Sequence, residues 1–147
     1  MGKDSSRIAK KLHRYMDRLY STIYSRRDLE AEVDFDEYDT PLMGSVEGKL
    51  YFWDGSVLDI REVVTLVAGE LEKVSYSYNY RRADGVLIFR YDNWPHHPKL
   101  STFPHHKHVG DRIEAATAPD LSDVLREIDE ILYETTGESG SGEELRR

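Results

Sequence analysis

Five of the six histidines in this chain of 147 residues lie in one short segment, RYDNWPHHPKLSTFPHHKH, which runs from Arg90 to His108. Imidazole has an unperturbed pKa of about 6.5, so it both accepts and donates protons around neutrality, and it is also a common metal ligand. A structural loop has no reason to contain a titrating ring five times. We therefore interpret the segment as a functional site for acid–base chemistry or metal binding.

A metal site is the first of two arrangements that the segment allows. Side chains alternate along an extended chain, so His106 and His108 share a face. The chain has no cysteine, and a metal ion must therefore be held by histidine and carboxylate groups. The candidate ligands are His106 and His108 with a third from Asp92, His96 or His97, and zinc is the divalent ion we consider. The spacing matches neither a zinc finger nor an HExxH motif.

A metal-free acid–base site is the second arrangement, and it needs no cofactor. Two imidazoles would lie on either side of a phosphodiester and move protons at the two ends of a transesterification through a ribose 2′-OH. We assign the base and the acid to His106 and to His108 or His96, with Arg90 and Lys107 stabilising the charge on the phosphorane. The remaining polar groups of the segment are predicted to bind the substrate: Asp92, Asn93, His97, Lys99, His105 and Lys107.

The backbone of the segment is restricted by three prolines, which fix their own φ angles and favour extended conformations in the residues before them. We therefore predict an ordered, extended loop rather than a helix. Trp94, Leu100 and Phe103 are expected to pack this loop against the core and so hold its polar groups in a fixed arrangement.

Two β-hairpins are predicted to position this loop. The runs SVEGKLYFWDGSVLDIREVVTLV and LEKVSYSYNYRRADGVLIFRYDN each join two alternating strands through a glycine-containing turn. The acidic run before them, DLEAEVDFDEYDTPLMG, is predicted to contain a short edge strand. The result is an antiparallel sheet of four to five strands, which together with the histidine loop occupies residues 44–110. The tyrosines at 76, 78 and 80 are interpreted as packing residues rather than as a surface for stacking bases.

Amphipathic helices are predicted on both sides of the sheet in sequence. Apolar residues recur at spacings of three and four within residues 1–27 and again within 120–134, where Asp120 is the expected N-cap. An antiparallel sheet with one apolar face needs such a cover, so we predict a single α+β domain over residues 1–136. The sheet face away from the helices carries aromatic residues in this interpretation. Residues 137–147 are predicted to be a disordered tail.

The net charge of −8 excludes a general attraction to nucleic acid or anionic lipid, since both are polyanions. A nucleic-acid function therefore requires a local basic site. The first residues are charged, and no segment approaches the roughly 20 apolar residues needed to span a bilayer. We expect a soluble, cytoplasmic protein that does not associate with membranes.

The runs YSYNY, LIFRYDNWPHHP, TFPHHKHVG and LSDVLREI resemble the TumE family of small prokaryotic toxins over roughly residues 44–132. The double motif RYDN-x-PHHP and TFPHHKH is long and unusual, which makes this resemblance specific. It implies a toxin encoded beside an antitoxin that neutralises it by binding, often a DNA-binding helix-turn-helix protein. Ribonuclease action is a common route for such toxins, and RNA as the substrate follows by analogy.

Three functional hypotheses follow. The leading one is a toxin-like, metal-independent endoribonuclease that cleaves RNA through a 2′,3′-cyclic phosphate. The second is a metal-dependent hydrolase or nucleotidyl-modifying enzyme that uses the same imidazoles as ligands. The third is a non-catalytic protein whose aromatic sheet face binds a partner or a second copy of the chain, which gives a homodimer.

Overall fold

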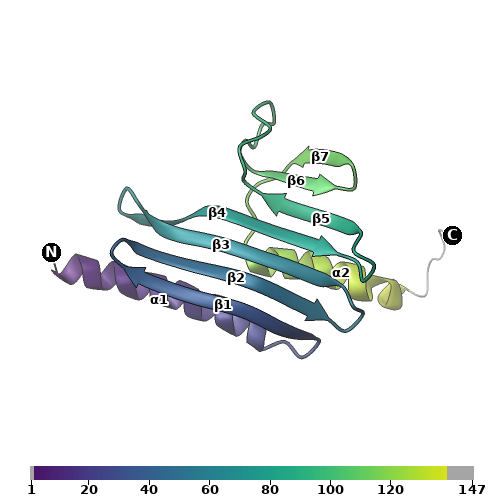
Figure 1. The fold of residues 1–147 in the computed structure, drawn as a ribbon, viewed down its shortest axis with the longest axis horizontal. Helices are drawn as coiled ribbons and strands as arrows, with labels where there is room; N and C mark the ends of the chain where they lie inside the picture. The colour runs from purple at the N-terminus through teal and green to yellow at the C-terminus, as the bar shows by residue number, and fades with distance from the viewer. Residues whose placement is uncertain (1, 139–147) are drawn as a thin grey trace.

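The computed structural model describes residues 2–138 of the chain, and side chains from residue 6 to residue 133. Its elements, in chain order, are α1 (Gly2–Tyr24), β1 (Leu29–Asp39), β2 (Leu42–Phe52), β3 (Val57–Val67), β4 (Glu70–Arg81), β5 (Leu87–Asp92), β6 (His106–Val109), β7 (Arg112–Ala115) and α2 (Leu121–Glu138). The strands form one antiparallel sheet in which each pairs with the next along the chain (Figure 1). The α+β class is confirmed, whereas four to five strands is too low a count for a seven-stranded sheet.

Both predicted hairpins are present, as the pairs β2–β3 and β4–β5. The acidic run forms an edge strand as predicted, but β1 is long rather than short, because all its residues from Leu29 to Asp39 pair with β2. Alternate residues of β1, including Val33 and Phe35, pack against the core, while the carboxylates between them face solvent. Burial of these apolar residues stabilises a strand that its charge alone would disfavour.

Strand β6 falls where a loop was predicted, and β7 follows it in a stretch, after residue 110, for which the sequence predicted no element. Each has four residues, and they are joined by a turn in which Gly110 has a φ of +59°. Strands this short show little alternation in the sequence. They form because β6 pairs with β5, with Arg90 opposite His108 and Asp92 opposite His106.

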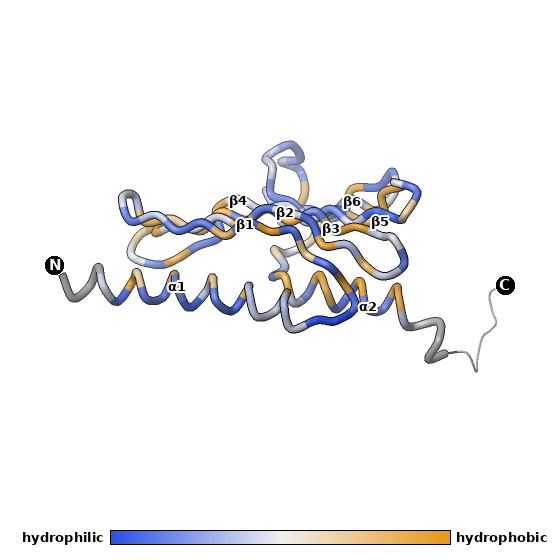
Figure 2. Tube along the Cα trace, turned by 60° about the horizontal axis from the view of Figure 1, so that its bottom comes forward, coloured by the Kyte–Doolittle hydropathy of each residue, from blue (hydrophilic) through white to orange (hydrophobic). Residues whose placement is uncertain are grey.

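The two helices lie one after the other along the same side of the sheet (Figure 2). Their predicted apolar stripes are buried against it, for example Leu12 and Ile23 of α1 and Ile128 of α2. Asp120 caps α2 as predicted, since its carboxylate accepts the N–H of Asp123 at 2.9 Å. The helix continues to residue 138, so residues 137 and 138 of the expected tail are helical, and 139–147 lie outside the described residues.

Tyrosines of β4 belong to the core as predicted: Tyr76, Tyr78 and Tyr80 are almost fully buried. The buried carboxylate of Glu62 accepts hydrogen bonds from Tyr78, at 2.5 Å, and from Tyr15 of α1. Burial, together with the charge of Glu62, raises the pKa of both phenols, so they remain donors at neutral pH. This network fixes α1 against β3 and β4.

The face of the sheet away from the helices is mostly polar rather than aromatic. Tyr51 lies on it and donates to Glu32 at 3.0 Å, but Trp53 packs instead against Tyr133 of α2. Polar side chains from the central strands complete this face: Lys49, Asp59, Arg61, Ser75, Ser77, Asn79 and Arg81. Within the described residues, neither helix has the length and apolar content that crossing a bilayer requires.

Candidate functional site

The histidine site lies on the uncovered face of the sheet, where β5 and β6 pair. On the opposite side of these strands, Tyr91 and Lys107 both contact Glu127 of α2, at 2.7 and 2.6 Å. Because side chains alternate along a strand, their neighbours must point away from the helices. His106 and His108 therefore lie together on the uncovered face, as the sequence predicted.

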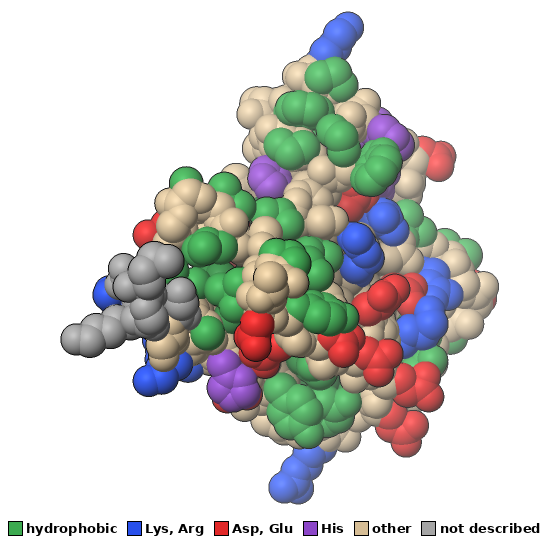
Figure 3. Space-filling view, turned by 60° about the vertical axis from the view of Figure 1, so that its left-hand side comes forward, with side chains coloured by type: hydrophobic (Ala, Val, Ile, Leu, Met, Phe, Trp, Pro, Cys, Tyr) green, Lys and Arg blue, Asp and Glu red, His purple; other side chains and the backbone are tan. Residues whose placement is uncertain are grey.

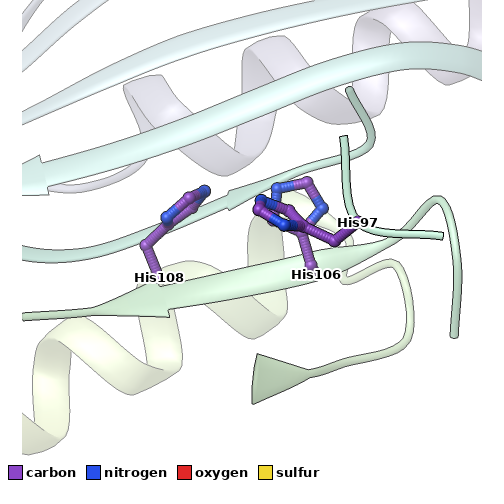
Figure 4. Close-up of side chains that lie close together, drawn as sticks. All are labelled: His97, His106 and His108. Carbon is purple, nitrogen blue, oxygen red and sulfur yellow. The ribbon is translucent and has the colours of Figure 1, made fainter. Parts of the chain in front are cut away.

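The segment between β5 and β6 rises from this face and brings a third imidazole to the pair (Figures 1 and 2). The ring centroid of His97 is 4.9 Å from that of His106 and 6.0 Å from that of His108. One ring nitrogen from each of the three lies within 4.8 Å of the others. Figure 4 shows the three rings gathered over β6, which makes them a single cluster.

The loop that carries His97 is not a helix, but it is not extended either. Successive turns hold it, with the N–H of Leu100 bonded to the carbonyl of His97 and the N–H of Phe103 bonded to that of Leu100. Prolines favour extended conformations only in the residues before them, so residues 99–102 are free to turn. This folding brings His97 over β6.

Asp92 is the anion at the base of the cluster. Its buried carboxylate accepts from Arg90 Nε at 2.7 Å and from the N–H of Trp94 at 2.9 Å. His106 Nε2 lies 3.1 Å and His108 Nε2 3.7 Å from its two oxygens. Burial raises the pKa of Asp92, but these hydrogen bonds and positive charges outweigh it and lower the pKa, so the group is ionised at neutral pH.

His106 is the most buried member of the cluster, with a side-chain exposure of 2%. Its Nδ1 lies 2.9 Å from the carbonyl oxygen of Pro104, while Nε2 faces Asp92. A carbonyl only accepts, so Nδ1 carries a proton and donates it. Nε2 is then the nitrogen that binds Asp92 when protonated or a metal ion when not.

His108 is more accessible, with a side-chain exposure of 27%. Burial lowers its pKa; the carboxylate of Asp92 opposes this shift, and the nearby groups His106, Arg90 and His97 add to it. The net pKa is below the ordinary value, so His108 is neutral at pH 7. A neutral imidazole suits both a general base and a metal ligand.

Two predicted histidines are not part of the cluster. His105 points elsewhere: its Nδ1 lies 2.9 Å from the hydroxyl of Tyr76, and burial, with the charge of Lys73, lowers its pKa. His96 is exposed and lies between Trp94 and His97. It makes a T-shaped ring contact with each, and its ring centroid is 5.6 Å from that of Trp94 and 6.1 Å from that of His97. It therefore borders the cluster rather than joining it.

Lys107, which the sequence predicted to stabilise charge in the site, lies apart from the imidazoles. It lies on the helix side of β6, where its Nζ donates to Glu127 at 2.6 Å, so strand alternation separates it from the imidazoles. Asn93 has a structural role, since its amide bonds the N–H of Tyr76 and the carbonyl of Val74. Lys99 is exposed on the loop near His97.

The packing of the loop also differs from the prediction. Trp94 is 62% exposed and Phe103 43% exposed, so neither pins the loop to the core. Turn hydrogen bonds and Thr102, whose hydroxyl donates to the carbonyl of His105 and accepts the N–H of Ala116, hold the loop instead. Its aromatic side chains are therefore available at the surface.

The sequence profile of the family described as Toxin TumE matches residues 16–135 of this chain. The chain belongs to the toxin TumE family. The match includes the whole sheet and the acidic run of β1, and so extends further than the motifs alone. Neither the curated proteins nor the solved structures give a significant match. Membership in this toxin family implies an antitoxin partner in general terms.

Sequence reasoning missed two groups in this TumE site. One is the carbonyl of Pro104, which fixes the tautomer of His106. The other is Asn79, whose side-chain oxygen lies 3.5 Å from Nη1 of Arg90 across the β4–β5 pair. Neither has a signal in the sequence, because a backbone carbonyl has no side chain and Asn79 depends on strand register.

Proposed function

We propose that this TumE family chain is the toxin of a toxin–antitoxin pair and that it cleaves RNA at the cluster of His97, His106 and His108. The antitoxin would be of the helix-turn-helix type that our sequence analysis proposed. Family membership supports the toxin assignment. The observation that carries the chemical part is three imidazoles and a carboxylate gathered on the uncovered face of the sheet.

His108 is the general base in this proposal. Its neutral ring takes the proton of a ribose 2′-OH, whose oxygen then attacks the adjacent phosphorus. His97 faces His108 from the loop and donates a proton to the 5′-oxygen that leaves, so a 2′,3′-cyclic phosphate and a free 5′-OH are formed. Arg90, which is 39% exposed and pairs with Asp92 beside the cluster, stabilises charge on the phosphorane in this proposal.

His106 takes a different role from the one that the sequence favoured. Both its ring nitrogens face acceptors and its side chain is buried, so it cannot exchange protons freely with a substrate. It positions Asp92 and the neighbouring rings. The pair of proton-transferring groups is therefore His97 and His108, rather than His106 with His108 or His96.

The test is cleavage of a short RNA by purified protein, with the 3′ ends of the products analysed for cyclic phosphate. His108→Ala and His97→Ala should each reduce the rate about 100- to 10,000-fold. His13→Ala is the matched control, because His13 is an exposed helix residue, 64% exposed, that pairs with Glu37. Equal rates for His108→Ala and His13→Ala would refute the proposal.

A divalent metal ion at the same cluster is the second candidate, and zinc is the ion that fits best. The hydrogen bond from Nδ1–H of His106 to the carbonyl of Pro104 supports this candidate. Histidines that bind a metal through one ring nitrogen typically donate the N–H of the other nitrogen to such an acceptor. Asp92 contacts two of the three imidazoles, with one oxygen 3.1 Å from His106 Nε2 and the other 3.7 Å from His108 Nε2, and so orients these ligands from beside the site. At Zn–N distances of about 2.0–2.1 Å, tetrahedral ligand atoms are about 3.4 Å apart, so the three nitrogens, which lie within 4.8 Å of one another, would move closer to hold one ion.

Metal analysis of protein purified without an affinity tag tests this candidate. One zinc per chain, lost in His97→Ala but retained in His105→Ala, would support it, since His105 lies outside the cluster. Zinc should also raise the melting temperature of the wild-type protein and not that of His97→Ala. Full RNA cleavage in excess chelator would instead support the metal-free mechanism.

A further inference from the structure

A cavity of about 400 Å³ borders the histidine cluster. Its lining comes from the loop and from β7: His96, His97, Pro98, Lys99, Leu100 and Ile113. His97 belongs to both the cavity and the cluster, so the two adjoin. A single ligand can therefore place one of its groups in the cavity and a phosphate at the cluster. This volume lies within the range of small-molecule sites, about 300–1,000 Å³.

The surface around the cavity is unusually apolar for an exposed loop. Trp94 and Ile113 are 62% and 40% exposed; Ile113 lines the cavity, and Trp94 lies edge-on against His96 at its wall. Leaving large apolar side chains in water forfeits the free energy that their burial would supply. Such side chains at a cavity beside a cluster of imidazoles indicate a surface that binds something flat and apolar.

Lys99 adds positive charge at this cavity. Within residues 6–133 it has no acidic partner, whereas Arg90 beside the cluster is paired with Asp92. The protein as a whole carries −8, and acidic side chains crowd together on the face drawn in Figure 3. Lys99 therefore attracts a phosphate locally, although the net negative charge of the protein repels polyanions at long range.

We infer that this cavity binds an unpaired nucleobase next to the scissile phosphate of the RNA, an inference that rests on the proposed function. Single-stranded bases are recognised by stacking on aromatic and imidazole rings, which His96, His97 and Trp94 supply. Ile113 and Leu100 provide the apolar wall, and Lys99 contacts a flanking phosphate. An unpaired base fits better than an acyl chain, because the cavity is flanked by rings and a cation.

Direct binding of nucleotides tests the cavity without any cleavage. The chain has two tryptophans, so Trp53→Phe leaves Trp94 as the sole reporter beside the cavity. Titration of this variant with adenosine or uridine 3′-monophosphate should change its fluorescence saturably. Adding Ile113→Ala should weaken binding about ten-fold, as expected when apolar contact with a bound base is lost.

Ile131→Ala is the matched control, because Ile131 is an isoleucine of α2 with 42% exposure, close to the 40% of Ile113. It should leave nucleotide binding unchanged. The inference is overturned if nucleotides leave the fluorescence of Trp94 unchanged, or if both isoleucine variants bind like their parent.

The outcomes also separate this inference from the proposed function. Saturable nucleotide binding in a protein that cleaves no RNA would keep the base site and reject the ribonuclease. If the protein cleaves RNA and Ile113→Ala leaves KM unchanged, the ribonuclease proposal stands and the base-binding cavity is rejected. If both hold, Ile113→Ala should raise KM about ten-fold and leave kcat close to the wild-type value.

Discussion

Replacing Asp92 by asparagine should destabilise the fold because no orientation of the amide satisfies the groups around it. One carboxylate oxygen accepts from Arg90 Nε and the other accepts from the N–H of Trp94 and faces His106. An amide has only one oxygen. Whichever end carries the NH₂ group then opposes an N–H, of Arg90 in one orientation and of Trp94 in the other.

The size of the effect follows from burial. The side chains of Asp92 and His106 are 6% and 2% exposed, so water cannot replace the lost interactions. Hydrogen bonds to charged groups contribute about 1.5–3 kcal/mol each. Since Arg90 is 39% exposed, its part is smaller. We expect the free energy of unfolding to fall by about 2–4 kcal/mol.

Urea unfolding at pH 7, followed by circular dichroism, measures this change. Asp84→Asn is a matched control, because Asp84 also accepts from an arginine two residues before it, Arg82, and from an N–H two residues after it, that of Val86. That turn is exposed and contains no imidazole, so its variant should lose much less stability. If both variants lost the same free energy of unfolding, burial and the neighbouring histidines would contribute nothing to the stabilisation by Asp92.

Two further predictions concern the scaffold. Gly48→Ala should lower the free energy of unfolding by at least about 2 kcal/mol in thermal denaturation, because a Cβ there would lie 2.1 Å from the backbone oxygen of Glu32 on β1. Gly85→Ala, where a Cβ meets nothing within 4 Å, should cost only the strain of its φ of +89°, and an equal loss would contradict this. Asp28→Asn should lower the free energy of unfolding by about 1–2 kcal/mol at pH 7, because Asp28 accepts hydrogen bonds from Arg26 and Tyr133. Burial raises the pKa of Asp28, but these hydrogen bonds outweigh it and lower the pKa. That stabilisation is present above the ordinary pKa of about 4 and is lost as the pH falls through the lowered pKa, so a wild-type advantage that did not shrink as the pH was lowered below about 4 would exclude this carboxylate as its source.

Features that depend on neighbours along the chain were predictable from the sequence. Strand alternation places His106 and His108 on one face, and the glycine turns define both hairpins. The same alternation places Lys107 on the opposite face, so the sequence already argued against its role in the site. The side chain of Asp120 caps the helix that follows it by a local hydrogen bond.

Features that depend on contacts between distant segments were settled by the tertiary structure. Which loop histidine reaches β6 depends on the turns of residues 97–105, and these select His97 over His96. The exposure of Trp94 and Phe103 depends on whether the core has room for them, and it is filled by the helices and the tyrosines of β4. No local pattern encodes either outcome.

The sequence by itself determined the residue types of the site, its alternation along β6 and the amphipathic elements that surround it, because these depend on chemistry and spacing within one segment. Tertiary structure decided that Asp92, His97, His106 and His108 meet on the uncovered face of a seven-stranded sheet. The reason is physical: the pairing of β5 with β6 places Asp92, His106 and His108 on one face, and the turns of the loop between these strands bring His97 to them.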